Sequence, residues 1–398
     1  MDSIEASEFP LVFKADQQSL LQAPEVDGRI SVRTATRALA GMQKEAIVCY
    51  GHEGSVWRTV CDEGPWLNGT DLAPFPLGFF SAGLVASYLS EYLSHAKHQG
   101  LVIRQLQVMV DNHYSMEGSL LKETMTGSAL PVHVTFSVNA DADINQLNQL
   151  SYLAVATSPA DAYLREAQRS TFSLNRNSEQ VKVAEVLASA GAAVEDPETL
   201  FNKTIPSKSE LIAEDILEKL EAVESLGGDK LGAIKSAGNV GLSENQKRQL
   251  HVRGVGKLRS DGMKEVRVAC FTPVGSVFQL LSDDSILCGG QERAPSGLVY
   301  LAAGLSYCFM TQLGRYAQVA KQELQSYRIV QDAHFSLPYA ISAKQEPATS
   351  SAVDTQVFLQ TRESLENTQR LLRMGEQTCY LHAACRTAIK TRIQTAKI

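Results

Sequence analysis

The chain has 398 residues, of which 44% are hydrophobic and 20% charged, and its formal net charge is −7 at pH 7. This length is typical of two domains with a sizeable core. The acidic balance argues against nucleic acid or an anionic membrane surface as the main partner. No run of 18 apolar residues occurs, so no transmembrane helix is expected.

The seven cysteines are odd in number and widely spaced, and the start of the chain is acidic rather than basic and apolar. This pattern predicts a protein of the reducing cytoplasm rather than a secreted protein stabilised by disulfides. No Cys-x-x-Cys pair occurs, and Cys379, His382 and Cys385 lack a fourth ligand at zinc-finger spacing. We therefore expect neither a metal nor a cofactor.

The first predicted unit covers residues 28–184. Alternating β-branched segments between residues 29 and 51 predict strands, and a turn rich in Gly and Asp follows at 61–76. Residues 76–99 form an apolar stretch too long for a strand, so we expect a buried central helix there. Further alternating strands and a last helix that contains Ser158 complete an α+β unit, with helices on one face of a mainly antiparallel sheet.

Two segments lie outside the repeated units described below. Residues 1–27 form an N-terminal extension, and residues 185–249 form a connector. Within the connector, residues 208–234 are amphipathic, rich in Glu and Lys, and bounded by Pro and Gly. This composition predicts a surface helical hairpin that joins the units.

The second unit, residues 250–398, repeats the first at one constant offset. Ser87 and Cys308 take the same place in the two central helices, which we expect at 76–99 and 297–322. The offset between them also relates Gly83 to Gly304, Leu84 to Leu305, Asp62 to Asp283, Arg165 to Arg386 and Ser158 to Cys379. One ungapped offset that holds over about a hundred residues predicts a duplicated domain.

The order of these features resembles a known superfamily. A strand leads to a turn with Asp and Gly, then to a long helix with a mid-helix cysteine, and a second cysteine follows on a last helix ahead of an Arg. This order resembles the osmotically inducible protein C and organic hydroperoxide resistance (OsmC/Ohr) superfamily, over residues 28–184 and 250–398. "AAGLSYCF" (302–309) is most similar to the organic hydroperoxide resistance branch.

The resemblance implies thiol peroxidases that work as tight homodimers, with the active site at the dimer interface. A tandem chain is then expected to fold as a pseudo-dimer within one polypeptide, with higher oligomers also open. Cys308 would be the reactive thiol and Cys379 the resolving thiol. "VRGVGKLRSDG" (252–262) is similar to the arginine-bearing hairpin of that branch, which would make Arg253 the active-site arginine.

Two departures from the family pattern matter for the site. The first unit has serine in place of both cysteines, at Ser87 and Ser158, so it is expected to be chemically silent. In the second unit the glutamate that opens the family's central helix aligns with Leu298, and Glu292 is the nearby candidate to replace it.

Cys308 could have a purely structural role as a small core residue, because free cysteine is among the most buried residue types. Cys308 and Cys379 are replaced together in the first unit, however, which is expected of a functional pair rather than of two independent packing positions. His382 follows Cys379 by one helical turn and is either a general base for a thiol or a surface or capping histidine.

We expect an organic hydroperoxide reductase in which Cys308 becomes a sulfenic acid, Cys379 forms a disulfide with it, and a dithiol reductant restores both. Apolar neighbours (Leu305, Tyr300, Phe309 and Met310) favour a fatty or aromatic hydroperoxide over hydrogen peroxide. Two alternatives stay open. One is a cysteine hydrolase that forms an acyl-enzyme from an ester or a diketone-like substrate. The other is a non-catalytic thiol sensor or ligand-binding pseudo-dimer.

Overall fold

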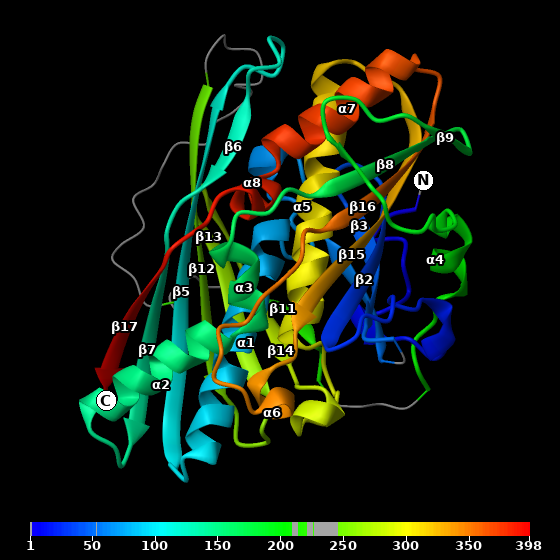
Figure 1. Ribbon diagram of the computed structural model, residues 1–398. Coiled ribbons are helices and arrows are strands. Elements are labelled where there is room, and N and C mark those ends of the chain that lie inside the picture. The colour runs from blue at the N-terminus through cyan, green and yellow to red at the C-terminus, as the bar shows by residue number, and fades with distance from the viewer. Residues whose placement is uncertain (1, 53, 209–213, 221–225, 227–245) are drawn as a thin grey trace.

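The structure is a computed structural model, and it describes residues 2–52, 54–208, 214–220, 226 and 246–398. Two large β-sheets enclose two long helices, α1 (Pro76–His98) and α5 (Gly297–Val319) (Figure 1). Helix α1 packs on one sheet and α5 on the other, and the two helices contact each other along their length. The molecule therefore has the layer order sheet, helix, helix, sheet.

The first sheet has the strand order β1-β4-β3-β2-β15-β16-β8-β10, with β9 paired to β8. The second has the order β11-β14-β13-β12-β5-β7-β17, with β6 paired to β5. The first sheet contains β1 (Val12–Lys14), β2 (Arg29–Ala38), β3 (Lys44–Tyr50), β4 (Val56–Cys61), β8 (Thr171–Arg176), β9 (Glu179–Val181), β10 (Leu187–Ala188), β15 (Leu324–Ser336) and β16 (Asp354–Thr361). The second contains β5 (Ile103–Gly118), β6 (Thr126–Ala129), β7 (Val132–Ala140), β11 (Leu217–Leu220), β12 (Gln246–Leu258), β13 (Lys264–Thr272), β14 (Val274–Ser282) and β17 (Thr391–Lys397).

Each sheet is built from both halves of the chain. Strand β2 of the first half pairs antiparallel with β15 of the second, and β12 of the second half pairs with β5 of the first. We expected a separate sheet for each unit. The structure differs because each three-stranded meander has an open edge, and the strand that covers this edge comes from the other half.

The two helices that end each half follow the same constant offset that relates Ser87 to Cys308. Helices α2 (Ile144–Thr157) and α3 (Pro159–Arg165) correspond residue for residue to α7 (Leu365–Thr378) and α8 (Tyr380–Arg386). The central helices α1 and α5 have the same relation, as do the short 3₁₀ turns Pro65–Leu67 and Ile286–Cys288. We expected one last helix in each unit, but the chain leaves helical geometry at Ser158 and Cys379, whose backbones are extended.

The connector differs from the predicted helical hairpin wherever it is described. Residues 217–220 form β11, which pairs antiparallel with β14, and Leu217 is buried against the second sheet. The other elements of residues 185–249 are β10, a 3₁₀ turn at Pro197–Thr199, the four-residue helix α4 (Leu200–Lys203) and the start of β12. The free edge of β14 thus outweighs the helical propensity of 217–220. Residues 209–213, 221–225 and 227–245 of the connector, which include most of the predicted hairpin, lie outside the described residues.

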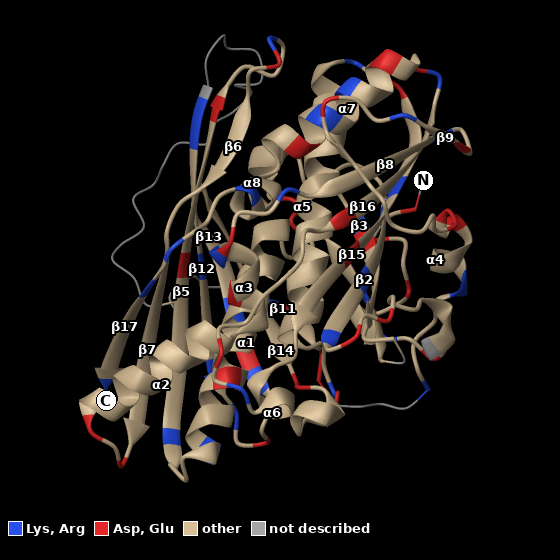
Figure 2. Ribbon diagram, viewed as in Figure 1, with Lys and Arg blue, Asp and Glu red and all other residues tan. Residues whose placement is uncertain are grey.

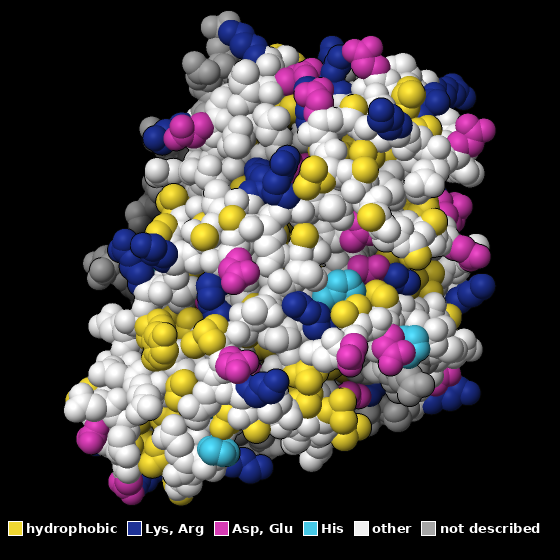
Figure 3. Space-filling view, in the orientation of Figure 1, with side chains coloured by type: hydrophobic (Ala, Val, Ile, Leu, Met, Phe, Trp, Pro, Cys, Tyr) yellow, Lys and Arg dark blue, Asp and Glu magenta, His cyan; other side chains and the backbone are white. Residues whose placement is uncertain are grey.

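Charged residues lie mainly on the strands, loops and shorter helices rather than on the two central helices (Figure 2). The visible face of the molecule carries acidic and basic groups intermixed with scattered hydrophobic ones (Figure 3). Within the described part of the chain, no helix is long and apolar enough to cross a membrane.

Glycines allow the two central helices to come close together. A Cβ atom added to Gly83 would lie 2.6 Å from the carbonyl oxygen of Gly297 and from the backbone nitrogen of Leu301. A Cβ atom added to Gly304 would lie 2.6 Å from the backbone nitrogen of Phe80. Since backbone atoms cannot rotate away as side chains do, any larger residue at these positions must separate the helices.

We predict that Gly83→Ala lowers the free energy of unfolding by about 1–3 kcal/mol, because it forces the α1–α5 contact apart. Gly78→Ala, on the same helix, is the matched control, since its Cβ would meet only side-chain atoms of Val268 and Phe75 at 3.2–3.3 Å. Urea denaturation of both variants measures the difference. A Gly83→Ala protein as stable as the Gly78→Ala protein would show that the helices do not need this close approach.

Candidate active site

The two cysteines singled out by the sequence lie together in the core. Cys308 is in the middle of α5, and Cys379 is the residue between α7 and α8. Their Sγ atoms are 3.3 Å apart, and their exposed fractions are 2% and 0%. Both are free thiols, and only a small movement would bring the two sulfurs to disulfide bonding distance.

His382 contacts Cys379 rather than Cys308. Its Nδ1 lies 3.2 Å from the Cys379 Sγ, and its ring packs against Phe172 and Phe309. The histidine is buried, and its Nε2 has no hydrogen-bond partner among the described residues. Of the two roles considered for His382, a surface position is therefore excluded, and the histidine belongs to the thiol pair.

The surroundings of the two thiols shift their pKa values in opposite directions. Burial, followed by the interaction with Cys379, raises the pKa of Cys308 well above its ordinary value. Burial alone would also raise the pKa of Cys379, but contact with Cys308 and with His382 outweighs it and lowers that pKa well below the ordinary range. In this coupled pair, loss of a proton is therefore favoured at Cys379 over Cys308.

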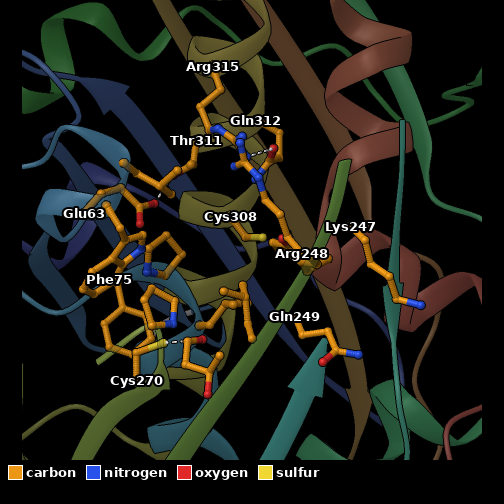
Figure 4. Close-up of a pocket in the computed structure, with 18 residues that line it drawn as sticks. Glu63, Phe75, Lys247, Arg248, Gln249, Cys270, Cys308, Thr311, Gln312 and Arg315 are labelled. Atoms are coloured by element: carbon orange, nitrogen blue, oxygen red, sulfur yellow. Dashed lines mark hydrogen bonds between the residues drawn. The ribbon is translucent and has the colours of Figure 1, made fainter. Parts of the chain in front are cut away.

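Cys308 faces a cavity of about 510 Å³ (Figure 4). The lining is mostly apolar and comes from both halves of the chain: Glu63, Trp66, Leu67, Phe75, Pro76, Leu77, Lys247, Arg248, Gln249, Leu250, Cys270, Thr272, Pro273, Cys308, Thr311, Gln312, Arg315 and Tyr380. Cys379 is behind Cys308 and does not line the cavity. A molecule in the cavity thus meets Cys308 first.

The apolar neighbours expected to surround a substrate belong to the core instead. Leu305, Tyr300, Phe309 and Met310 are buried and do not line the cavity. Because these residues lie on other faces of α5, the apolar walls are supplied mainly by the segment 66–77 of the first half.

Arg253 does not lie beside Cys308, contrary to the prediction. Its neighbour Val252 is buried in the core on the α1 side of β12, so alternation along the strand places Arg253 on the opposite face. There its Nε donates to Asp111 at 2.7 Å, and its guanidinium lies over the ring of Phe271. Burial opposes ionisation of Asp111, but hydrogen bonds from His251 and Arg253 lower its pKa to about 2.

Glu292 is also remote from the thiols. Its carboxylate pairs with the Nζ of Lys14 at 3.1 Å, in the loop that precedes α5. It does not line the Cys308 cavity. The loop holds Glu292 with positive φ, which turns the chain before Leu298 and carries the side chain toward the first sheet.

The acid that does lie in the cavity wall is Glu63, which sequence reasoning missed. Its Oε1 accepts a hydrogen bond from the Thr311 hydroxyl at 2.6 Å. Burial raises the pKa of Glu63, although Lys44 acts in the opposite direction. Glu63 is part of the Asp-Glu turn of the first half, so only the contact between the halves reveals that it faces a cysteine of the second.

The first half contains a counterpart of this site without the thiols. The hydroxyls of Ser87 and Ser158 are 2.8 Å apart, as the two sulfurs are near each other in the second half. Ser90 donates to Asp284 at 2.6 Å, which repeats the Thr311–Glu63 contact at the same offset. The cavity beside Ser87 is only about 40 Å³.

The short helix α6 (Tyr339–Ser342) closes this counterpart. The backbone N–H of Tyr339 lies 3.3 Å from both carboxylate oxygens of Glu91, and the Tyr339 ring stacks on His95 at 3.8 Å between ring centroids. Thr157 donates to Glu91 at 2.8 Å. Burial raises the pKa of Glu91 to about 8, and burial lowers the pKa of His95 to about 4.

A profile of the OsmC-like protein family matches residues 289–394, which include Cys308, Arg315, Cys379 and His382. This segment of the chain is thus similar to OsmC-like proteins. Among solved structures, it is similar to an OsmC-like hydroperoxide resistance protein from Jannaschia sp. CCS1. The identity is 20%, the TM-score is 0.21, and the match covers 33% of this chain and 83% of the other. No curated protein matches the chain.

The buried carboxyl of Glu91 predicts a pH-dependent stability difference between the wild type and Glu91→Gln. Because its pKa is higher in the folded than in the unfolded chain, the stability it contributes is complete at acid pH and is lost as pH rises toward 8. Urea denaturation at pH 5, 6.5, 8 and 9 should show the wild type losing stability relative to Glu91→Gln up to about pH 8. The His95 contribution is common to both proteins and cancels. Parallel stability curves would contradict a neutral buried Glu91.

Proposed function

We propose that the chain is a thiol-dependent organic hydroperoxide reductase, with Cys308 as the attacking thiol and Cys379 as the resolving thiol. The observation that carries this proposal is the pair of sulfurs 3.3 Å apart, one of which faces a mostly apolar cavity. The similarity to OsmC-like proteins over residues 289–394 supports it, since this segment contains both cysteines.

The cycle begins when the Cys308 proton passes to the Cys379–His382 side of the pair, which leaves a thiolate facing the cavity. This thiolate attacks the distal peroxide oxygen, the O–O bond breaks, and the leaving alkoxide takes a proton to become an alcohol. Glu63, whose raised pKa favours the protonated form, lies in the cavity wall and can supply that proton.

Cys308 is now a sulfenic acid, and Cys379 is already beside it. Attack of Cys379 on the Cys308 sulfur breaks the S–O bond and forms the disulfide, and the departing hydroxide becomes water by taking up the proton that Cys308 had passed to the Cys379–His382 side. A dithiol reductant then restores both thiols by two exchange steps and is itself oxidised. This requirement for a dithiol fits a reducing compartment such as the cytoplasm.

We further propose that the two halves are tandem OsmC-like copies that form an intramolecular pseudo-dimer. The constant offset between the element bounds of the two halves and the exchange of strands between them support this interpretation. In this interpretation each site is built from both copies. The Ser87–Ser158 site has hydroxyls in place of the two thiols and only a small cavity beside them.

The contact pattern disfavours the hydrolase alternative. A cysteine hydrolase needs a base beside the nucleophile that meets the substrate. Here the histidine contacts Cys379, which is fully buried and does not line the cavity. An acyl-enzyme cycle also has no role for Cys379, whereas the proposed peroxidase cycle requires it as the resolving thiol.

We predict that Cys308→Ser lowers the rate of cumene hydroperoxide reduction, measured with dithiothreitol as reductant, by about a hundredfold or more, because a serine hydroxyl is almost never ionised at neutral pH. Cys379→Ser should complete one turnover and stop, with a sulfenic acid on Cys308 that dimedone traps. Ser87→Ala and Ser158→Ala are the matched controls and should stay within a few-fold of the wild type. Repeated turnover by Cys379→Ser would overturn the resolving role and favour an acyl-enzyme.

A further inference from the structure

Two arginines of the cavity have no carboxylate partner among the residues that the structure describes. Arg315 is the single charged residue in the sequence of α5, is only 9% exposed, and its Nη1 donates to the neutral Gln312 at 3.1 Å. Arg248, at the start of β12, lines the same cavity. Within the described ranges, no Asp or Glu oxygen lies at ion-pair distance from either guanidinium.

Other buried arginines of this protein do have such partners. Arg58 pairs with Glu45 at 2.9 Å, and Arg328 pairs with Asp196 at 2.6 Å. A buried charge is costly unless it is paired, and the protein follows that rule elsewhere. The positive end of the Cys308 cavity is therefore an exception that calls for an external anion.

The charges near Arg315 compensate it only in part. Burial, followed by the neighbouring Arg248, lowers the pKa of Arg315, and the smaller opposing effects of Tyr380 and Glu63 do not outweigh them. Glu63 is the acid of the cavity lining, but burial favours its protonated form and its hydrogen bond goes to Thr311. The two guanidinium groups thus repel each other in a largely apolar space, and an anion between them would relieve this repulsion.

The position of this charged end relative to the thiol is set by α5. Arg315 follows Cys308 by two helical turns on the same face, or about 10 Å along the axis. Figure 4 shows Arg315, Gln312 and Arg248 together at one end of the cavity, with Cys308 further along. An anion bound by the two arginines would therefore lie further along α5 than the Cys308 thiol and would not contact the sulfur itself.

We propose that Arg248 and Arg315 form an anion subsite that binds a carboxylate of the substrate, while the apolar body of the substrate lies against Trp66 and Phe75 and its reacting group reaches Cys308. The substrate class is then an amphipathic carboxylate rather than a neutral apolar molecule. The identity of the reacting group as a hydroperoxide rests on the proposed function, whereas the binding of the carboxylate does not.

Isothermal titration calorimetry of the full-length reduced protein with decanoate and with 1-decanol tests this subsite. Decanoate should bind at least about tenfold more tightly than 1-decanol, because charge-assisted hydrogen bonds to two guanidinium groups are added to the same apolar contact. Added salt should weaken decanoate binding and leave decanol binding unchanged.

Arg315→Met and Arg248→Met should each abolish the preference for decanoate while decanol still binds. Arg248 is half-exposed, so its variant keeps the test valid if Arg315→Met fails to fold. Arg253→Gln is the matched control on the same strand, since its side chain is on the other face, and it should keep the preference.

Equal affinity for decanoate and decanol, or a preference that survives both methionine variants, would overturn the subsite. Binding of decyl phosphate without binding of decanoate would overturn the assignment of a carboxylate. Neither measurement requires turnover, so an inactive protein that prefers decanoate refutes the reductase alone, and an active protein without the preference refutes the subsite alone.

Discussion

The close crossing of α1 and α5 is the constraint on which the rest of the molecule depends. At Gly83 and Gly304 the helices approach so closely that a single added carbon would meet backbone atoms of the partner. This contact brings the turn of the first half, with Glu63, against the face of α5 that carries Cys308, Thr311 and Arg315. The candidate site therefore exists only where the two halves meet.

Strand exchange secures the same arrangement. Because β15 covers the edge of β2, and β5 covers the edge of β12, neither half can move away without breaking a sheet. The ribbon formed by β5 and β12 extends to Gly118 and Gln246 and supplies Arg248 to the cavity. At the equivalent place beside Ser87, the chain after β15 instead turns into α6, where Pro338 and Ala340 line the small cavity and Tyr339 contacts Glu91. One scaffold thus has an open side with thiols and a closed side without them.

Much of this arrangement was predictable from the sequence, for identifiable reasons. The central helices begin and end close to the predicted residues, because long apolar stretches bounded by turns leave little choice. The cysteine pair followed from the constant offset between the two units, since paired replacement at Ser87 and Ser158 is visible without a structure. The exchange of strands was not predictable, because either partner offers an edge strand the same backbone hydrogen bonds.

The errors and omissions also have physical causes. Arg253 was misplaced because the direction of a side chain alternates at every residue of a strand, so proximity in sequence to the site says nothing about the face. Glu63 was missed because it reaches the Cys308 cavity only through the contact between the halves, and Arg248 because it lies in the segment interpreted as a connector. Arg315 could have been recognised from the sequence as a candidate site residue. It is a single charge on an otherwise uncharged, buried helix, and it follows Cys308 by two helical turns.

The central claim is that Cys308 and Cys379 form one working redox pair among seven cysteines. It is tested most directly by treating the reduced protein with one equivalent of cumene hydroperoxide, alkylating the remaining thiols under denaturing conditions, and mapping the peptides by mass spectrometry. The account predicts a single disulfide that joins Cys308 to Cys379, with the other five cysteines alkylated. A protein that keeps both as free thiols, or that oxidises other cysteines first, would contradict it.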